Sequence, residues 1–591
     1  MNKKNKIGYA FSEHVFLTKK TFHKERNEDN GNHDILKRLP ILILGIVFIV
    51  FVLRLLTLQV VRGEYYERLS NENRVRTTLI PAPRGIILDR NGQALVRNTP
   101  AFGFVRDKDF EWLNQEEALK LMEDKSNQIL SISQRDYLYK DMFAHVLGYI
   151  GQLTLEEALQ SQFNGYGLSD FTGRMGIEES YERLLHGENG RQLIEVDVHG
   201  NYIRTLGEDF SIAGKNITTT LDLEIQKSVY DAMSEVEVGA AVVSDPRSGA
   251  ILALFSKPTF DPNLFTKSTS YEPDGGYQSV DEVLNEKTQP LLNRTISGSY
   301  SPGSTFKIVT ATAGLEENAI NPSTLIEDTG VRTIGGISFG TWNFLQYGKL
   351  EKPLNIVGAI RRSNDIFFYV LSERVGVKKI SEWAGKFGFG KILNIDIPGE
   401  IAGVVPGPSW KERIIGEDWY LGDTYNMSIG QGFVQATPLQ TNFMTNVIAN
   451  GGTLYKPHLV PDNKKVIRED FIDPENINLI RQGMYEACQT GGTGYPFFDF
   501  KVKNEKLKVD GLDYVESASA SAGTVNISVG CKTGTSETFD GGKPHAWFTV
   551  FAPFNNPEIS VTIIVEHGGE GSAVAAPIAK EILTDYFEKK D

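Results

Sequence analysis

Residues 301–307 read SPGSTFK, and the spacing of one serine and one lysine in this stretch gives the first indication of fold and chemistry. Positions i and i+3 share one face of a helix, so Ser304 and Lys307 are expected to meet. A serine hydroxyl is a poor nucleophile until a base takes its proton, and a lysine in a desolvated cleft can be that base. Pro302-Gly303 is expected to start the helix, whose free N–H groups can bind developing negative charge. S-x-x-K alone is a weak signal, because chance produces it about once or twice in a few hundred residues.

A second short motif, Ser363-Asn364-Asp365, stands immediately before the apolar stretch 366–371. Ser and Asp favour helix N-caps, so the motif could simply begin a helix. As chemistry, it offers a second hydroxyl that can relay a proton and a side chain that can bind a peptide amide. Both interpretations stay open on these residues alone.

A third motif, Lys532-Thr533-Gly534-Thr535, follows Gly530-Cys531 on a predicted strand. A cation, two hydroxyls and a glycine that permits close approach suit a carboxylate and an extended peptide backbone. The simpler alternative is an edge strand with ordinary polar exposure.

The region around the three motifs, residues 218–591, reads as one α+β domain. It begins with a helix that Asp222 can cap and with two apolar strands, 240–244 and 250–256, around a turn. It ends with two strands, 546–552 and 559–566, and a helix, 578–587. Strands at both ends with helical segments between them predict a mixed or antiparallel sheet sandwiched by helices.

The preceding stretch, residues 62–217, is predicted to form a separate domain. Residues 62–80 read as a helix ended by two prolines, and residues 85–92 as a strand that enters an Asn-Gly turn. Residues 110–126 are expected to be helical, and 177–185 to form a short amphipathic helix.

Residues 39–61 are almost uninterruptedly apolar and approach the ~20 residues that span a bilayer. A buried core helix or a cleaved signal peptide are the alternatives, but a long arm precedes the stretch and no A-x-A cleavage pattern follows it. The arm, residues 1–38, is basic. The positive-inside rule therefore places the N-terminus in the cytoplasm and everything after Val61 on the outer face.

Composition excludes some partners and sites. The net charge of −14 over 591 residues argues against a nucleic-acid partner. The two cysteines, Cys488 and Cys531, have no neighbouring Cys or His at metal-ligand spacing. We expect two free, partly buried thiols, because free cysteine behaves as a small hydrophobe, although a disulfide between them stays open.

The order S-x-x-K, S-x-[ND], K-T-G is the active-serine set of penicillin-binding proteins and class A β-lactamases. Further matching stretches begin near Pro81: RG at 84–85, DRNG at 89–92, GIE at 176–178, FGFG at 387–390, IPGE at 397–400 and SIGQG at 428–432. The chain resembles the class B penicillin-binding proteins. AHVLGY at 144–149 and FAPFNNP at 551–557 resemble the elongation type, penicillin-binding protein 2, more than the septal type.

This resemblance implies a membrane-anchored peptidoglycan D,D-transpeptidase. It implies a transmembrane helix at 39–61, an elongated non-catalytic pedestal at 62–217 and a β-lactamase-like transpeptidase domain at 218–591. Ser304 would attack the carbonyl between the two terminal D-alanines of a stem peptide, and Lys307 would take its proton. Ser363 and Lys532 would pass a proton to the leaving D-alanine.

The same resemblance implies the substrate contacts and the partners. Backbone N–H groups of Ser304 and Thr535 would form the oxyanion hole, and Asp365, Thr533, Gly534 and Thr535 would bind the substrate. An amine from a second stem peptide on nascent, lipid-linked glycan would resolve the acyl-enzyme, and β-lactams would acylate the same serine. A separate membrane glycosyltransferase of the SEDS (shape, elongation, division and sporulation) family would polymerise the glycan, and it would contact the span 39–61 and the pedestal near Arg84 and Asp89. No cofactor is implied.

Three departures from the family pattern stand out. Asp365 occupies a position where the family usually has Asn. The stretch between Gly92 and Ala144 is short, which predicts a reduced head of the pedestal. Some members hold zinc between the first two motifs, but between Lys307 and Ser363 this chain has no His and no Cys, so no metal is expected.

Two alternatives remain beside cross-linking. A D,D-carboxypeptidase or β-lactamase would need an efficient deacylating water, and a penicillin-binding sensor or scaffold would need no turnover. The predicted anchor and the large N-terminal module favour cross-linking. The complete set Ser304, Lys307 and Lys532 argues against an inactive scaffold.

Overall fold

The computed structural model describes residues 33–106, 109–113, 115–122, 129–160, 166, 170–197, 202–266, 271–504, 507, 514–516, 524–538 and 541–590. Most of the basic arm lies outside these ranges. The chain divides into two compact units, one of residues up to Arg76 with Glu195–Ile203 and one of Thr77–Ile194 with Arg204–Asp591.

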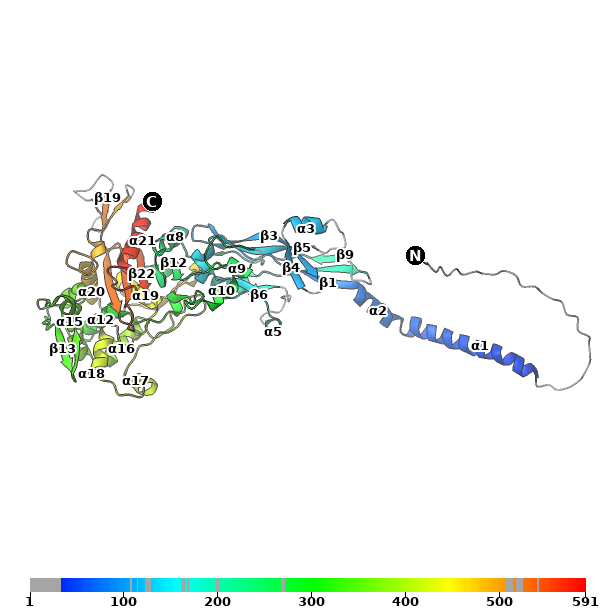
Figure 1. Cartoon of the computed structure of the whole chain (residues 1–591), viewed down its shortest axis with the longest axis horizontal. Helices are drawn as coiled ribbons and strands as arrows, with labels where there is room; N and C mark the ends of the chain where they lie inside the picture. Colours follow the sequence, from blue (N-terminus) through cyan, green and yellow to red (C-terminus); the bar gives the residue numbers. More distant parts are fainter. Residues whose placement is uncertain are drawn as a thin grey trace, which may run out of the picture. The chain divides into compact units, whose positions relative to one another are not determined.

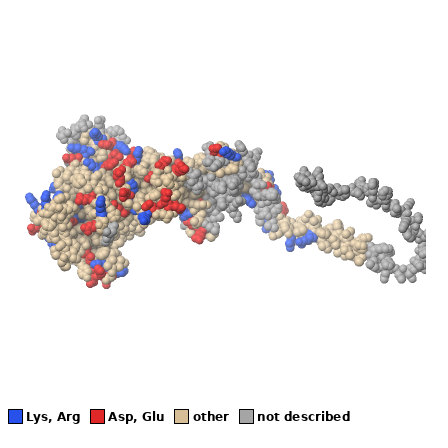
Figure 2. Space-filling view, viewed as in Figure 1, with Lys and Arg blue, Asp and Glu red and all other residues tan. Residues whose placement is uncertain are grey.

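The first unit contains the predicted span. Helix α1 (His33–Leu56) continues into a π-helical turn (Thr57–Val61), and helix α2 (Gly63–Arg74) follows. Leu39–Val61 has a mean hydropathy of 3.0 and no buried residue, and Figure 2 shows this helix with few charged side chains. Among the described residues it is the one helix long and apolar enough to cross a membrane.

The helix expected over residues 62–80 forms only in its first part. The helix ends at Arg74 and strand β1 (Val75–Ile80) follows it. The sequence VRTTLI explains the change, because β-branched residues favour strands.

Most of the predicted pedestal lies in the second unit, while the end of β8 and the start of β9 belong to the first. Its further elements are β2 (Ile87–Leu88), β3 (Ala94–Arg106), β4 (Asp109–Leu113), α3 (Gln115–Met122), β5 (Ile129–Tyr137), α4 (Ala144–Leu147), β6 (Ile150–Gln152), α5 (Leu155–Ala158), β7 (Phe171–Gly173), α6 (Gly176–Ser180), α7 (Glu182–Leu185), β8 (Gly190–Val196), β9 (Tyr202–Asp209) and β10 (Ile217–Thr218). The helix expected over 110–126 is wrong in its first part, where β4 pairs with β3, and its last residues lie outside the described ranges. The helix expected over 177–185 is interrupted at Tyr181.

A buried ion cluster in the pedestal joins two residues of the matching stretches, Arg84 and Glu178, to Arg135, which lies outside them. The fully buried Glu178 accepts hydrogen bonds from Arg84 Nε at 2.6 Å and from Arg135 Nε at 2.7 Å. Arg84 also donates to Glu182 at 2.5 Å. Burial alone would raise the pKa of Glu178, but Arg135 and Arg84 outweigh it and the pKa is lowered. The motif residues therefore hold this domain together rather than act on a ligand.

The predicted transpeptidase domain follows, and Figure 1 shows its helices around a central sheet. Its helices are α8 (Leu223–Ala232), α9 (Asn263–Thr266), α10 (Val280–Asn285), α11 (Arg294–Ser297), α12 (Lys307–Glu316), α13 (Trp342–Tyr347), α14 (Ile356–Arg362), α15 (Asp365–Val375), α16 (Val377–Lys386), α17 (Pro408–Ile414), α18 (Leu421–Ser428), α19 (Pro438–Ala449), α20 (Pro474–Ala487) and α21 (Ala575–Lys589). Its strands are β11 (Gly239–Asp245), β12 (Ala250–Lys257), β13 (Val331–Ile334), β14 (Ile337–Gly340), β15 (Leu454–Tyr455), β16 (Val466–Arg468), β17 (Lys501–Lys503), β18 (Tyr514–Glu516), β19 (Thr524–Ile527), β20 (Gly530–Ser536), β21 (His545–Ala552) and β22 (Ile559–Val565).

The central sheet has the strand order β12-β11-β22-β21-β20, and every neighbouring pair is antiparallel. The four strands and the last helix expected from the ends of the domain all form close to their predicted bounds. The first and last strands of the domain, β11 and β22, lie side by side, so the sheet joins the beginning of the domain to its end. β20, which carries the third motif, forms one edge.

The two faces of this sheet are covered in different ways. Helices α8 and α21 pack on one face with apolar side chains such as Val243, Val561 and Ile582. Helix α19 packs on the other face through hydrogen bonds between buried polar side chains. Its Asn442 donates to Thr562 Oγ1 at 3.2 Å, and Thr445 pairs with Thr549 at 2.7 Å. We call these serine, threonine and asparagine side chains the polar layer. It also contains Ser244, Asn446 and Ser560.

Candidate active site

Ser304 lies on a single 3-10 turn (Gly303–Phe306) directly before α12, not in the α-helix that the sequence predicted. Side chains at i and i+3 eclipse in such a turn, but the polar contacts of Lys307 go to Ser363 and Asp365, and the structure as described shows no hydrogen bond from it to Ser304. Gly303 has φ +55°, and a Cβ there would stand 2.7 Å from the carbonyl oxygen of Thr535. Only glycine therefore lets the serine turn approach strand β20 this closely.

Lys307 is fully buried beneath the turn and makes three polar contacts. Its Nζ donates to Asp365 Oδ1 at 2.6 Å, to the backbone oxygen of Ser363 at 2.8 Å and to Ser363 Oγ at 3.2 Å. The first two motifs are therefore joined directly, through the lysine of one and the serine and carboxylate of the other.

The middle motif sits in the junction between α14 and α15. Ser363 ends α14 in the left-handed region, with φ 52°, which is uncommon for a residue with a Cβ. The motif does begin helix α15, but the capping residue is Asn364, which accepts from Phe367 N at 2.9 Å, rather than Ser363 or Asp365. The cap leaves its neighbours free for the cleft, where Asp365 Oδ2 also accepts from Trp342 N at 3.1 Å.

Strand β20 brings the third motif to the same place. Among the described strands β20 pairs with β21 alone, and its residues Thr533, Gly534 and Thr535 line the cleft described below. Lys532 is fully buried, and its Nζ donates to Ser363 Oγ at 2.9 Å and to the backbone oxygen of Thr533 at 2.8 Å. A Cβ on Gly534 would stand 2.8 Å from Trp547 Cβ and 3.0 Å from Thr305 Cγ2, so this position also needs glycine.

Both buried lysines lose basicity in this environment. Burial lowers the pKa of Lys307, although Asp365 opposes the change by ion pairing. Burial lowers the pKa of Lys532 well below its ordinary value, and the nearby charge of Lys307 lowers it further. Burial of both amines and the repulsion between them therefore disfavour the state in which both lysines are protonated.

A cleft of about 1070 Å³ opens over these residues. Six of the eight predicted site residues line it, while Lys307 and Lys532 lie beneath its floor. Those six are Ser304, Ser363, Asp365, Thr533, Gly534 and Thr535. The structure therefore brings the whole predicted set together.

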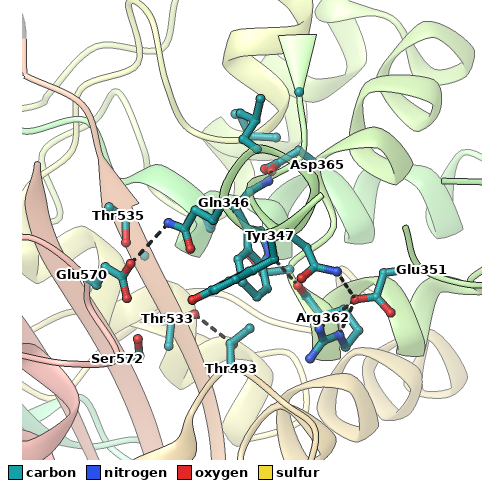
Figure 3. A pocket seen from close by; sticks show the side chains of 18 of the residues that line it. Gln346, Tyr347, Glu351, Arg362, Asp365, Thr493, Thr533, Thr535, Glu570 and Ser572 are labelled. Carbon is teal, nitrogen blue, oxygen red and sulfur yellow. Dashed lines mark hydrogen bonds and ion pairs between the residues drawn. The ribbon is translucent and has the colours of Figure 1, made fainter. Parts of the chain in front are cut away.

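The sequence analysis missed several residues of this cleft. Helix α13 forms one wall, and its Gln346 donates to Glu570 across the cleft at 3.3 Å, with Tyr347 beside them (Figure 3). Thr493 accepts from Thr533 Oγ1 at 2.9 Å, and Gln431 donates to the backbone oxygen of Thr535 at 3.2 Å. Only Gln431 belonged to a stretch that matched the family; the others carry no motif.

The cysteines differ from the expectation. Cys488 and Cys531 form a disulfide, and both are fully buried rather than partly buried free thiols. The bond joins the end of α20 to β20 next to Lys532. The two residues lie 43 positions apart, so nothing in their local spacing indicated the pair. Within the described ranges no group of three His, Cys, Asp or Glu side chains could hold a metal ion, and the absence of zinc stays a prediction.

Comparison with family models gives two matches. Residues 239–584 match the penicillin-binding protein transpeptidase domain, and residues 111–219 match the penicillin-binding protein dimerisation domain. A curated relative from Haemophilus influenzae, the peptidoglycan D,D-transpeptidase MrdA, is 30% identical, over 94% of this chain and 92% of the relative.

Solved structures give the same result. The complex between penicillin-binding protein PBP2 and MreC from Helicobacter pylori contains a chain that is 26% identical, with a TM-score of 0.72 over 87% of this chain and 99% of that one. A peptidoglycan synthase complex, described as coordinating polymerization and crosslinking, contains another chain 26% identical, with a TM-score of 0.70 over 95% of this chain and 99% of that one.

Proposed function

The chain belongs to the family of penicillin-binding transpeptidases, and from that premise we propose how its own residues divide the chemistry of cross-linking. It is a peptidoglycan D,D-transpeptidase of the elongation type, a serine enzyme that β-lactams acylate. The reaction breaks the amide bond between the two terminal D-alanines of one stem peptide. It then joins the remaining acyl group to an amine of a second stem peptide.

In this proposal Ser304 is the nucleophile and Lys307 takes its proton. Ser363 and Lys532 return a proton to the leaving D-alanine. Thr533 and Thr535 hold the terminal carboxylate, Gly534 lets the peptide backbone approach, and Asp365 borders the peptide. The backbone N–H groups of Ser304 and Thr535 stabilise the oxyanion.

The observation that carries these roles is the contact of both lysines with one hydroxyl. Ser363 Oγ receives Lys307 Nζ at 3.2 Å and Lys532 Nζ at 2.9 Å, beneath the cleft that Ser304 lines. A proton can pass between two buried amines through a single oxygen. The unpaired edge of β20 beside them suits an extended peptide, which can add to the sheet as a strand.

The nucleophile is tested by labelling the full-length protein with a fluorescent penicillin and mapping the modified peptide by mass spectrometry. Ser304→Ala should abolish labelling while the melting temperature is unchanged. Ser338→Ala is the matched control, since this serine lines the same cleft on β14. Stoichiometric labelling of Ser304→Ala would refute the assignment.

The apolar helix Leu39–Val61 is consistent with a single-pass membrane anchor. We propose that the N-terminus is cytoplasmic and the catalytic domain extracytoplasmic. The basic arm before the helix supports this orientation by the positive-inside rule.

The partner of this enzyme must supply polymerised glycan, and we propose a SEDS-family glycosyltransferase. Contact was expected near Arg84 and Asp89 in the pedestal, but both side chains are buried, so neither can itself touch a partner. The span is the other expected contact. Gly45 lies within it, and its lack of a side chain would let a partner helix approach the backbone closely.

Replacing Leu39–Val61 with an unrelated apolar helix tests this contact. Penicillin acylation should be unchanged, whereas copurification with the glycosyltransferase should weaken. Gly45→Leu is a smaller change that should act in the same direction. Unchanged copurification and polymerase activity after the swap would reduce the span to an anchor.

A further inference from the structure

Lys307 has the contacts of an ammonium group. An ammonium has three N–H donors and no acceptor, and all three polar contacts of Lys307 Nζ are to oxygens. Two of these, the backbone oxygen of Ser363 and the carboxylate of Asp365, can only accept. The carboxylate among these contacts favours the charged form, and an ammonium has no lone pair to receive the Ser304 proton.

Lys532 is placed differently. Within the described part of the chain it forms no ion pair with a carboxylate, and its two contacts are Ser363 Oγ and the backbone oxygen of Thr533. A neutral amine satisfies this environment, with one N–H on Thr533 and its lone pair receiving the Ser363 hydroxyl proton. Ser363 Oγ can then accept from Lys307. In this arrangement the Ser363 hydroxyl both donates and accepts, and every N–H of the Lys307 ammonium has an acceptor.

The remaining titratable groups near the lysines do not compete for the proton. Tyr369 on α15 stays neutral, because burial, and then the charges of Asp365 and Glu537, raise its pKa. Tyr425 on α18 stacks on Tyr369, and its pKa is raised by burial too. Asp365 is consequently the one carboxylate in direct contact with the lysine pair among the described residues.

We propose that Asp365 keeps Lys307 protonated in the resting enzyme. When a donor peptide binds, its carboxylate favours transfer of a proton from Lys307 through Ser363 to Lys532. Lys307 is then neutral and can act as the base. This rests on the proposed function. A negative charge held by Thr533 and Thr535 stabilises an ammonium at Lys532, since opposite charges attract strongly at a buried site. Asp365 is thus a positioning residue that keeps the base inactive until the substrate arrives.

The protons balance through the whole step. Lys307 gives a proton to Ser363 Oγ as the Ser363 hydroxyl proton passes to Lys532. Neutral Lys307 then takes the Ser304 proton while the bond from Ser304 Oγ to the carbonyl carbon forms. As the C–N bond between the D-alanines breaks, Lys532 returns its proton through Ser363 to the leaving amine. The acyl-enzyme again holds an ammonium at Lys307 and a neutral Lys532.

The test compares two probes on the full-length enzyme across pH. One is a β-lactam with its free carboxylate, and the other is the same β-lactam with that carboxylate esterified. With the wild-type enzyme, the acylation rate falls as the pH is lowered, and this fall is called the acid limb below. The acid limb should lie about one pH unit lower for the carboxylate probe than for the ester. In Asp365→Asn the acid limb for the ester should move down by about one unit or more, because the amide no longer holds the proton.

Glu351→Gln is the matched control, because it removes another carboxylate of the cleft that pairs with Arg362 rather than with a lysine. Its profiles should match the wild type. Identical acid limbs for the two probes on the wild-type enzyme would overturn the proposal, and this comparison needs no variant to fold. A folded Asp365→Asn enzyme with an unchanged ester profile would overturn it as well. Failure of the proposed function is distinct, since it would appear as labelling that survives Ser304→Ala.

Discussion

The disulfide between Cys488 and Cys531 gives the most quantitative test of the structure. It closes a loop of 43 residues between α20 and β20. In the chain-entropy model, a cross-link stabilises the fold by removing the freedom of that loop from the unfolded chain. For this loop length the model gives about 4 kcal/mol near room temperature. Reduction should therefore remove a substantial part of the domain's stability.

Urea unfolding of the full-length protein in detergent measures this free energy. Tryptophan fluorescence is a suitable signal, because Trp547 is fully buried on β21 next to β20. The unfolding free energy should fall by about 4 kcal/mol when reductant is present throughout. The double variant Cys488→Ala and Cys531→Ala should resemble the reduced protein and should not respond to reductant.

Thiol titration of the denatured protein supplies an independent check. No thiol should react before reduction and two should react afterwards. Two reactive thiols without reductant would restore the free cysteines that we expected from the sequence. Equal unfolding free energies with and without reductant would show that the bond does not constrain the unfolded chain.

Three further predictions concern proton binding, the pedestal and metals. Burial lowers the pKa of His145 from 6.5 to about 4, so the folded protein resists protonation there. The contribution of His145 to the free energy of unfolding should be full above pH 6.5 and fall by about 1.4 kcal/mol per pH unit as the pH drops toward 4. His145→Gln, which can still donate to the backbone oxygen of Pro290, should flatten this part of the plot of unfolding free energy against pH. Glu178→Gln leaves the buried Arg135 without its carboxylate and Arg84 with Glu182 alone, and should cost about 3–5 kcal/mol in thermal unfolding. An equal loss from Glu182→Gln, whose carboxylate is partly exposed, would contradict this account. Elemental analysis should find substoichiometric zinc and chelators should not slow acylation, so one tightly bound zinc per chain would disprove the metal prediction.

The parts of the fold that the sequence predicted are those that local pattern determines. The apolar span, the Asp222 cap and the paired strands at both ends of the transpeptidase domain each depend on neighbouring residues. The three site motifs were found for a similar reason, since each is short and their order is specific. The helices predicted over 62–80 and 110–126 were partly wrong, because part of each segment forms a strand. Composition alone does not separate a polar strand from a helix where packing decides between them.

The features that the sequence could not predict depend on contacts between distant positions. Thr493 and Gln346 reach the cleft only because their segments fold over β20 and α15, and the disulfide pairs two cysteines without a spacing signal. The contact of Lys307 with Asp365 is of the same kind. From the sequence we expected the Asp365 carboxylate to bind the substrate, whereas in the structure it contacts Lys307.

The polar layer between α19 and the central sheet has a consequence for the uniqueness of the packing. An apolar interface can lose little when a helix slides by one turn, because one methyl group replaces another. Here each side chain has a specific partner, as Asn442 has with Thr562, and a shift would leave buried polar groups without hydrogen bonds. These hydrogen bonds therefore favour the native alignment of the helix on the strands over one shifted by a turn. β21 belongs to that layer through Thr549 and pairs with β20, so this alignment also fixes how far Lys532 reaches toward Ser363.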